Sequence, residues 1–266
     1  MKKRTASVDA ARTLNGMPTA IEFRETTFAT TQGRLLLDGI SLAVEEGTTM
    51  VLLGRSGSGK TTLLRTVNRM VMPTSGEVRV QGESVGKGDP VALRRGIGYV
   101  IQETGLFPHF TIERNAGLVL EASGRPRKER LERSHELLAL AGLDPESFAH
   151  RYPHQLSGGQ RQRAGLARAL AADPSILLMD EPFGALDPLT RVEMQDMLRG
   201  ILARMRKTVL LVTHDLNEAL YLGDRIALLD EGKLIAVLAP REFLASDDAH
   251  VREYVKAYYR GAEARR

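Results

Sequence analysis

Residues 49–67 read TMVLLGRSGSGKTTLLRTV, in which an apolar run leads through a glycine-rich turn into a helical pattern. The run Thr49–Leu53 predicts a strand that is buried on both faces. Gly54–Thr61 has the spacing G-x-x-x-x-G-K-[ST]. Its glycines let several backbone N–H groups point at one anion, and the helix that follows adds its positive end. The segment therefore predicts a phosphate site between a buried strand and a helix.

Two side chains of this motif predict a bound nucleotide with its metal ion. Lys60 is expected to reach the β- and γ-phosphates of the nucleotide, and the hydroxyl of Thr61 is expected to ligate Mg²⁺. A flexible surface loop is the alternative interpretation. It conflicts with the buried strand on one side of the motif and the helix on the other.

Strand and helix patterns alternate along the rest of the chain, which predicts an α/β fold with a mostly parallel sheet. Further strands are expected at 97–102, 175–179, 208–213 and 225–229. Patterns at 21–28, 35–44 and 77–82 predict additional strands near the amino terminus. Helical periodicity at 111–123 and 127–141 indicates a helical insert over about 105–165. We expect a loosely held tail over 1–19, one nucleotide-binding domain over 20–240 and a helical extension over 241–266.

A pair of carboxylates follows the apolar run Ile176–Met179. Successive side chains of a strand point to opposite faces, so Asp180 and Glu181 are expected to do different work. Asp180 suits the shell of Mg²⁺, and Glu181 is then free to orient or deprotonate a water beside the γ-phosphate. An acidic turn leading into Pro182 is the alternative, and the phosphate loop argues against it.

Two isolated polar residues also follow apolar runs, Gln102 after IGYVI and His214 after TVLLVT. Each one alone is more typical of a cap or a turn. Open α/β sheets, however, bind ligands at the carboxyl ends of their strands. Gln102 and His214 are therefore expected near the same γ-phosphate and Mg²⁺ as Asp180 and Glu181.

A second anion site is predicted where Leu156-Ser157-Gly158-Gly159-Gln160 opens a helix. It combines a serine hydroxyl, two glycines and a helix amino terminus, without a lysine.

Composition excludes several other classes of protein. The 266 residues are 42% apolar and 26% charged, which is enough for a core and argues against disorder. No cysteine is present, so disulfides, iron–sulfur clusters, thiolate zinc sites and cysteine nucleophiles are excluded. A net charge of +4, with 5% aromatic residues and no Trp, argues against a nucleic-acid partner. No apolar run is long enough for a membrane span, and the first 16 residues lack the apolar region of a secretory signal.

The order of these motifs, with Ala185-Leu186-Asp187 between Glu181 and His214, resembles the ATP-binding cassette (ABC) ATPases. The resemblance extends from Ile21 to about Ala257. It implies a P-loop NTPase (RecA-like) core, an antiparallel β subdomain and a helical signature subdomain. It also implies a head-to-tail homodimer, in which each ATP lies between the phosphate loop of one copy and the Ser157 segment of the other. Phe28 matches the position that stacks on adenine, with core packing as the alternative.

The segments 94–102, 105–109 and 152–156 further resemble the cassettes of importers for osmoprotectants such as glycine betaine, choline, carnitine and proline betaine. This resemblance implies membrane permease subunits as partners, a substrate-binding protein acting indirectly, and a peripheral place on the cytoplasmic face of the cell membrane. The segment Phe107-Pro108-His109 lies where such cassettes receive the permease. Many members carry CBS domains after the cassette, which are not expected in this chain. An importer for another small solute and a cytosolic ABC ATPase without transport remain alternatives.

The predicted site residues fall into three groups. Catalytic roles are expected for Glu181 and His214. The metal ligands are expected to be Thr61, Gln102 and Asp180. Nucleotide contacts are expected from Phe28, Gly54, Arg55, Ser56, Gly57, Ser58, Gly59, Lys60, Thr61, Thr62, Gln102, Ser157, Gly158, Gly159, Gln160 and Asp187.

Overall fold

The computed structural model describes residues 18–102 and 105–263. Residues 1–17 of the predicted tail lie outside the described residues. The first strand already begins at Thr19.

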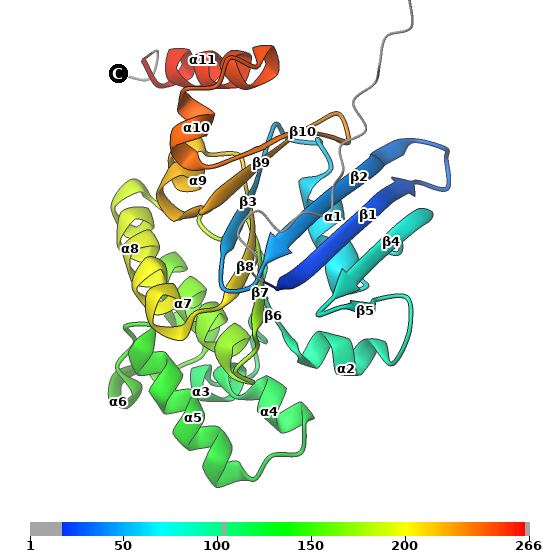
Figure 1. Ribbon diagram of the computed structural model, residues 1–266. Helices are drawn as coiled ribbons and strands as arrows, with labels where there is room; N and C mark the ends of the chain where they lie inside the picture. Colours follow the sequence, from blue (N-terminus) through cyan, green and yellow to red (C-terminus); the bar gives the residue numbers. More distant parts are fainter. Residues whose placement is uncertain (1–17, 103–104, 264–266) are drawn as a thin grey trace, which may run out of the picture.

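A six-stranded sheet forms the centre of the molecule, with the strand order β10-β9-β3-β8-β7-β6 (Figure 1). Its strands are β3 (Thr49–Leu53), β6 (Ile97–Val100), β7 (Ile176–Asp180), β8 (Thr208–Thr213), β9 (Arg225–Asp230) and β10 (Lys233–Leu238). All neighbouring pairs are parallel except β9 and β10, which form an antiparallel hairpin. The predicted α/β fold with a mostly parallel sheet is confirmed.

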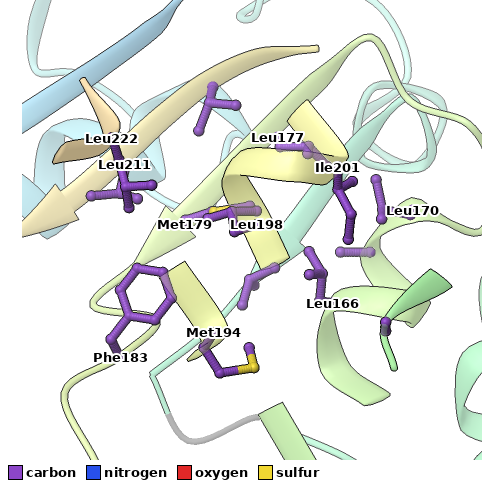
Figure 2. Packing of buried hydrophobic residues seen from close by; sticks show 14 of the residues in the cluster. Leu166, Leu170, Leu177, Met179, Phe183, Met194, Leu198, Ile201, Leu211 and Leu222 are labelled. Atoms are coloured by element: carbon purple, nitrogen blue, oxygen red, sulfur yellow. The ribbon is translucent and has the colours of Figure 1, made fainter. Parts of the chain in front are cut away.

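Alternate residues of the central strands supply two separate cores. In β7, Leu177 and Met179 belong to one cluster, while Ile176 and Leu178 belong to the other. Figure 2 shows the first cluster, in which Met179 packs with Leu198 and other residues of the helices that cover this face. Because both faces are covered, the central strands are apolar at nearly every position, as the sequence predicted.

An antiparallel sheet covers the opposite face of the central sheet. Its strand order is β2-β1-β4-β5, from β1 (Thr19–Ala29), β2 (Leu35–Glu45), β4 (Ser75–Val80) and β5 (Glu83–Ser84). Helix α1 (Lys60–Val67) contributes Leu63, Leu64 and Val67 to the core between the two sheets. The predicted antiparallel β subdomain is present.

The stretch between β6 and β7 is helical, as expected. It contains α3 (Ile112–Ala116), α4 (Leu118–Ala122), α5 (Arg127–Leu140), α6 (Pro145–Phe148), the 3₁₀ turn η1 (Pro153–Gln155) and α7 (Gly158–Leu170). The segment 111–123, with its helical periodicity, forms two short helices that meet at Gly117. A Cβ on Gly117 would lie 2.6 Å from Oγ of Ser134, so α5 approaches the chain closely at this break.

The remaining helices are α2 (Pro90–Arg95), α8 (Pro188–Met205), α9 (Leu216–Leu222), α10 (Pro240–Leu244) and α11 (Ala249–Glu263). Helices α7, α8 and α9 contribute to the core on one face of the central sheet, and α10 and α11 follow the β9–β10 hairpin (Figure 1). In the described part of the chain, no helix combines the length and the hydropathy that a membrane crossing needs.

Candidate functional site

The phosphate loop joins the end of β3 to α1 in the predicted manner. Gly54 has a φ of 154°, and a Cβ at this position would collide with the backbone carbonyl of Leu229 in β9. Only glycine fits between the loop and the neighbouring strand. Of the other predicted loop residues, Arg55, Ser56 and Gly57 are exposed and Ser58, Gly59 and Lys60 are buried.

Lys60 lies at the first position of α1 with only 5% of its surface exposed. Its Nζ donates hydrogen bonds of 2.8 Å to the carbonyls of Gly54 and Arg55, so the ammonium lies over the loop. Burial lowers the pKa of Lys60, and the negative charges of Glu181 and Asp180 oppose that shift. Beside it, the Oγ of Ser58 is buried without a hydrogen-bond partner among the described residues. A buried donor left unpaired inside a loop of backbone N–H groups fits a phosphate ligand.

Asp180 is the last residue of β7 and is 5% exposed. Its Oδ1 accepts a 2.7 Å hydrogen bond from the hydroxyl of Thr61, and its Oδ2 lies 3.5 Å from Nη2 of Arg65. A carboxylate and a hydroxyl oxygen at this separation are the hard donors that Mg²⁺ prefers. The residues present therefore fit the predicted metal ion.

Gln102 lies near Glu181, since a Cβ added to Gly184 would be 3.9 Å from Nε2 of Gln102 and 3.6 Å from Oε2 of Glu181. Strand β6 ends at Val100, two residues earlier than the pattern predicted, and Gln102 follows it on an exposed turn. Its side chain lines a pocket of about 250 Å³ with Arg161 of α7 and the chain that follows Glu181. In the described part of the chain, no hydrogen bond joins Gln102 to Thr61 or Asp180, so its role as a ligand stays a prediction.

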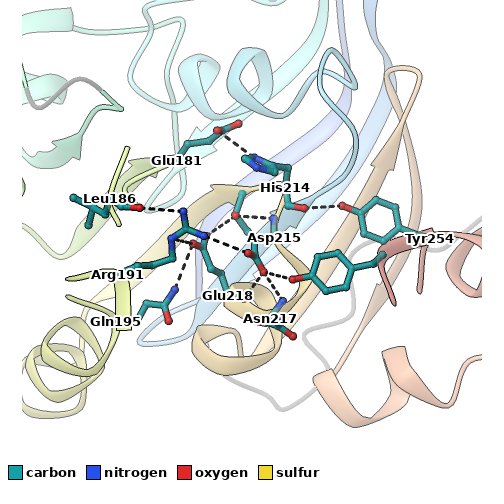
Figure 3. Close-up of polar contacts among 11 residues, drawn as sticks. Glu181, Leu186, Arg191, Gln195, His214, Asp215, Asn217, Glu218 and Tyr254 are labelled. Carbon is teal, nitrogen blue, oxygen red and sulfur yellow. Dashed lines mark hydrogen bonds and ion pairs between the residues drawn. The ribbon is translucent and has the colours of Figure 1, made fainter. Parts of the chain in front are cut away.

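Glu181 and His214 face each other across the ends of β7 and β8 (Figure 3). The Nδ1 of His214 lies 3.2 Å from Oε2 of Glu181, and the imidazole is 62% exposed. The expectation that strand alternation separates Asp180 from Glu181 is wrong, because β7 ends at Asp180. Glu181 has a φ of 46°, and its N–H donates to the carbonyl of Val212 at 3.0 Å. This turn, and not the pleat, directs the carboxylate toward His214.

A polar network behind His214 was not expected from the sequence. Asp215 caps α9 by accepting from the backbone N–H groups of Asn217 and Glu218, at 2.8 and 3.3 Å. Its other oxygen lies 3.7 Å from Nη1 of Arg191, whose Nη2 donates to the carbonyl of Leu186 at 3.3 Å. The segment Asp215-Leu216-Asn217-Glu218 carries the signal of a helix cap, but the partners on α8 depend on the tertiary fold.

The buried carboxylate of Glu218 completes this network. It accepts a 2.6 Å hydrogen bond from the hydroxyl of Thr213, the last residue of β8. Burial raises the pKa of Glu218, and the hydrogen bond from Thr213 counteracts the shift. Figure 3 shows Arg191, Asp215 and Glu218 gathered between α8 and α9.

The predicted second anion site opens α7. Ser157 caps the helix by accepting from the N–H of Gln160 at 3.2 Å, and the side chain of Gln160 accepts from the N–H of Ser157 at 2.9 Å. A Cβ on Gly159 would collide with Cγ2 of Thr190, so the start of α7 packs directly on the start of α8. The glycine thus has a packing role that the sequence did not reveal. Gly158 lies beside it in the first turn of α7.

Asp187 caps α8 in the same way, by accepting a 3.1 Å hydrogen bond from the N–H of Thr190. Hydrogen bonding to Thr190 lowers the pKa of this carboxyl. Ser157 and Asp187 are therefore both cap residues at the amino terminus of a helix. The contact between Gly159 and Thr190 keeps the two helix starts side by side.

Phe28 lies near the end of β1, half-buried against the core between the two sheets. It pairs with Leu37 in β2. The preceding residue of β2, Leu36, lies against the phosphate loop, because a Cβ added to Gly59 would be 2.6 Å from its carbonyl oxygen. Phe28 is therefore close to the loop in space, although it also contributes to the core. Thr62 follows Thr61 in the first turn of α1 and is half-buried.

Comparison with known proteins places this arrangement in a family. The ABC transporter family profile matches residues 37–184. The chain is 49% identical over 209 residues to the osmoprotectant import ATP-binding protein OsmV of Salmonella typhimurium. The match covers 79% of this chain and 55% of that protein. It is 46% identical over 224 residues to the glycine betaine/carnitine/choline transport ATP-binding protein OpuCA of Bacillus subtilis, covering 84% of this chain and 59% of the relative. The chain thus spans little more than half the length of these relatives.

A solved structure with a similar fold is a dimeric post-hydrolysis state of the ATP-binding cassette MJ0796 bound to ADP and Pi. It has a TM-score of 0.75 and 36% identity, and the match covers 83% of this chain and 99% of that one. The sequence comparison and the fold agree with the resemblance drawn from the motifs. The chain belongs to the ABC transporter family.

Proposed function

We propose that the chain is the ATP-hydrolysing subunit of an importer for a quaternary-amine osmoprotectant of the glycine betaine or choline type. The proposal of ATP hydrolysis rests on one observation: two pairs of residues meet at one edge of the central sheet. Lys60 and Thr61 follow β3, and Asp180 and Glu181 come from the end of β7. His214 follows β8, the strand between them. Ligands of open α/β sheets bind at this edge.

The proposed chemistry assigns a separate task to each side chain. Lys60 and the loop N–H groups bind the phosphates of ATP, and the hydroxyl of Ser58 supplies a further donor. Thr61 and Asp180 would hold Mg²⁺, which neutralises phosphate charge when it is bound. Glu181 accepts a proton from the attacking water, and His214 orients Glu181 and donates to the γ-phosphate. Phe28 stacks on the adenine.

Two copies are proposed to bind ATP between them in a head-to-tail arrangement. The hydroxyl of Ser157 accepts from Gln160 but keeps its own proton, which is free to donate to a phosphate oxygen of the partner's nucleotide. Asp187 lies at the adjacent loop. In support, the similar structures of MJ0796 are described as dimeric.

A membrane permease is the proposed partner at the segment Gly105–Phe110. Phe107 is 49% exposed and stacks on Phe110 with 5.3 Å between ring centroids. The fully buried Asn115 holds this segment by accepting from the N–H of Phe107 at 2.7 Å and donating to the carbonyls of Phe107 and Phe110 at 3.1 Å. An exposed aromatic pair on a fixed loop suits a protein partner. Through the permease, the chain would lie peripherally on the cytoplasmic face of the membrane.

The quaternary-amine substrate is proposed from the relatives, whose printed names include osmoprotectant, choline, carnitine and glycine betaine transport. The chain has no contact with the solute in this scheme, because a substrate-binding protein delivers it to the permease. The names of the relatives are the support for this part of the proposal.

The test is reconstitution of the chain with its permease and binding protein in lipid vesicles. We expect glycine betaine or choline, loaded on the binding protein, to stimulate ATP hydrolysis and to accumulate inside the vesicles. If only an amino acid or only an inorganic anion stimulates hydrolysis, that compound class is the substrate and the quaternary amine is rejected. Phe107→Ala should weaken co-purification with the permease, whereas Val91→Ala, an equally exposed apolar residue on α2, should not. ATPase activity without any membrane partner in the native host would reject the importer assignment.

A further inference from the structure

Helix α11 lies against the part of the molecule that carries His214. Val251 in its first turn is fully buried, and Tyr254, Val255 and Tyr258 pack against the core that α8 and α9 share. The tyrosines are four residues apart, so they lie on the same face of the helix. This face therefore rests on the loop between β8 and α9.

Both tyrosine hydroxyls reach that loop. The hydroxyl of Tyr254 donates to the backbone carbonyl of His214 at 3.1 Å (Figure 3). The hydroxyl of Tyr258 donates to Oδ1 of Asp215 at 2.7 Å. The first contact is to the main chain of His214, the residue proposed to donate to the γ-phosphate. The other is made to the carboxylate that caps α9. A third contact, between Glu253 and Arg55 of the phosphate loop at 3.5 Å, joins two exposed side chains and is expected to contribute little.

The Asp215 carboxylate connects α11 to a second loop of the site. Its Oδ1 accepts from Tyr258 and from the amino terminus of α9, while its Oδ2 lies 3.7 Å from Arg191 of α8. Arg191 in turn donates to the carbonyl of Leu186, next to the Asp187 cap. One carboxylate thus ties α8, α9 and α11 together behind the two loops that carry His214 and Asp187.

We propose that Tyr254 and Tyr258 are positioning residues, which hold the His214–Asp215 loop and, through Asp215 and Arg191, the Leu186–Asp187 loop in the geometry required for ATP hydrolysis. The inference rests on the proposed ATPase function. Neither tyrosine touches the reacting atoms; they act through His214 and Asp215. A movement of α11 away from this loop would then lower the rate of hydrolysis without changing the phosphate loop.

The test compares Tyr258→Phe and Tyr254→Phe with Tyr259→Phe, all in the full chain. Tyr259 is the neighbouring residue on α11 and is 45% exposed, so it controls for the loss of one tyrosine hydroxyl from this helix. Phenylalanine keeps the aromatic ring in each case. The measurements are kcat and KM for ATP, and the hydrogen exchange of the backbone N–H groups of Asn217 and Glu218 without nucleotide.

We expect Tyr258→Phe to lower kcat by roughly fivefold at an unchanged KM, the effect of one lost hydrogen bond, and to speed exchange at Asn217 and Glu218 by a similar factor. Tyr254→Phe should lower kcat in the same direction. Tyr259→Phe should match the unaltered protein in both measurements. The proposal is overturned if Tyr258→Phe behaves like Tyr259→Phe, or if its exchange rises uniformly over the chain, since that result indicates only a loss of stability.

A double variant tests the connection through Asp215. Because Tyr258 and Arg191 act on the same carboxylate, Tyr258→Phe combined with Arg191→Lys should lower kcat by less than the product of the two single losses. A loss equal to that product contradicts the connection. If the unaltered protein binds ATP but does not hydrolyse it, the proposed function fails, and hydrogen exchange still decides whether the tyrosines hold the loop.

Discussion

Oε2 of Glu181 lies 3.2 Å from Nδ1 of His214, although the two residues follow different strands. The contact depends on the left-handed turn at Glu181, which directs the carboxylate toward the neighbouring strand end. The same carboxylate is set apart from Asp180, which contacts Thr61 and Arg65. The two neighbouring carboxylates therefore have different partners within one site, and the proposed mechanism gives each a different task.

The first prediction separates proton transfer from binding at Glu181. Glu181→Gln keeps the size of the side chain but removes the base, so hydrolysis should fall by roughly 100-fold to 10,000-fold. ATP affinity should stay unchanged, and an ATP-dependent dimer should accumulate because the bound nucleotide is not consumed. Size-exclusion chromatography with ATP and a phosphate-release assay provide the two measurements. Glu132→Gln, an exposed glutamate of α5, serves as the control. Wild-type turnover in Glu181→Gln would rule out the base assignment.

The second prediction concerns Mg²⁺ at Asp180. Asp180→Asn keeps an oxygen for the Thr61 hydroxyl but removes the charge, so the Mg²⁺ concentration for half-maximal hydrolysis should rise by roughly tenfold or more. ATP binding measured with a chelator should not change. Asp247→Asn, at an exposed position after α10, should leave the Mg²⁺ dependence as it was. An unchanged Mg²⁺ requirement in Asp180→Asn would place the metal elsewhere.

The third prediction tests the packing role of Gly159. Gly159→Ala introduces a methyl group that collides with Cγ2 of Thr190, and this overpacking should cost about 1–3 kcal/mol of the free energy of unfolding. Adding Thr190→Ser removes the opposing methyl group and should restore most of that loss. Gly200→Ala in α8, where the added methyl group would meet no neighbouring side chain or other segment within 4 Å, should be neutral or slightly stabilising. Denaturant unfolding gives all three values.

If Thr190→Ser restores stability but not hydrolysis, Gly159 also contacts the nucleotide, as the resemblance implies. Failure of the second substitution to restore stability would instead mean that the collision is not what destabilises the variant.

The fourth prediction follows from the ionisation of Tyr254. Burial, together with the charge of Asp215, raises the pKa of Tyr254 from 10.0 to about 12. A group whose pKa is raised by folding stabilises the protein below its unfolded pKa and loses that contribution as the pH rises through the folded one. The free energy of unfolding should therefore fall between pH 10 and about 12. In Tyr254→Phe this fall should be smaller, whereas Tyr259→Phe should retain it. Equal slopes for the two variants would exclude Tyr254 as the source.

Local sequence patterns predicted the central strands and the phosphate loop well, because each position there admits few residue types. The run Thr49–Leu53 has to be apolar on both faces, and Gly54 has to be glycine because Leu229 lies against it. The positions of Asp180 and His214 could be predicted for a similar reason, since each directly ends or follows a buried strand.

What the sequence did not reveal depends on contacts between distant segments. Ser134 on another helix leaves no room for a side chain at Gly117, and Thr190 leaves none at Gly159. The turn at Glu181 is held by a carbonyl of β8, so a pattern that ends at Asp180 contains no sign of it. Tyr254 and Tyr258 show a helical spacing, but nothing in that spacing indicates that they meet His214 and Asp215.

The β9–β10 turn has a consequence for the order in which the chain becomes functional. The N–H of Gly232 donates to the carbonyl of Ser58 at 3.2 Å, and the carbonyl of Gly232 accepts from the N–H of Asp38 at 2.9 Å. The phosphate loop is thus completed by residues that leave the ribosome long after Lys60 has been synthesised. Contacts so distant in sequence form late in folding. A nascent chain that already displays the whole glycine-rich motif should remain unable to hold ATP until this hairpin has closed on it.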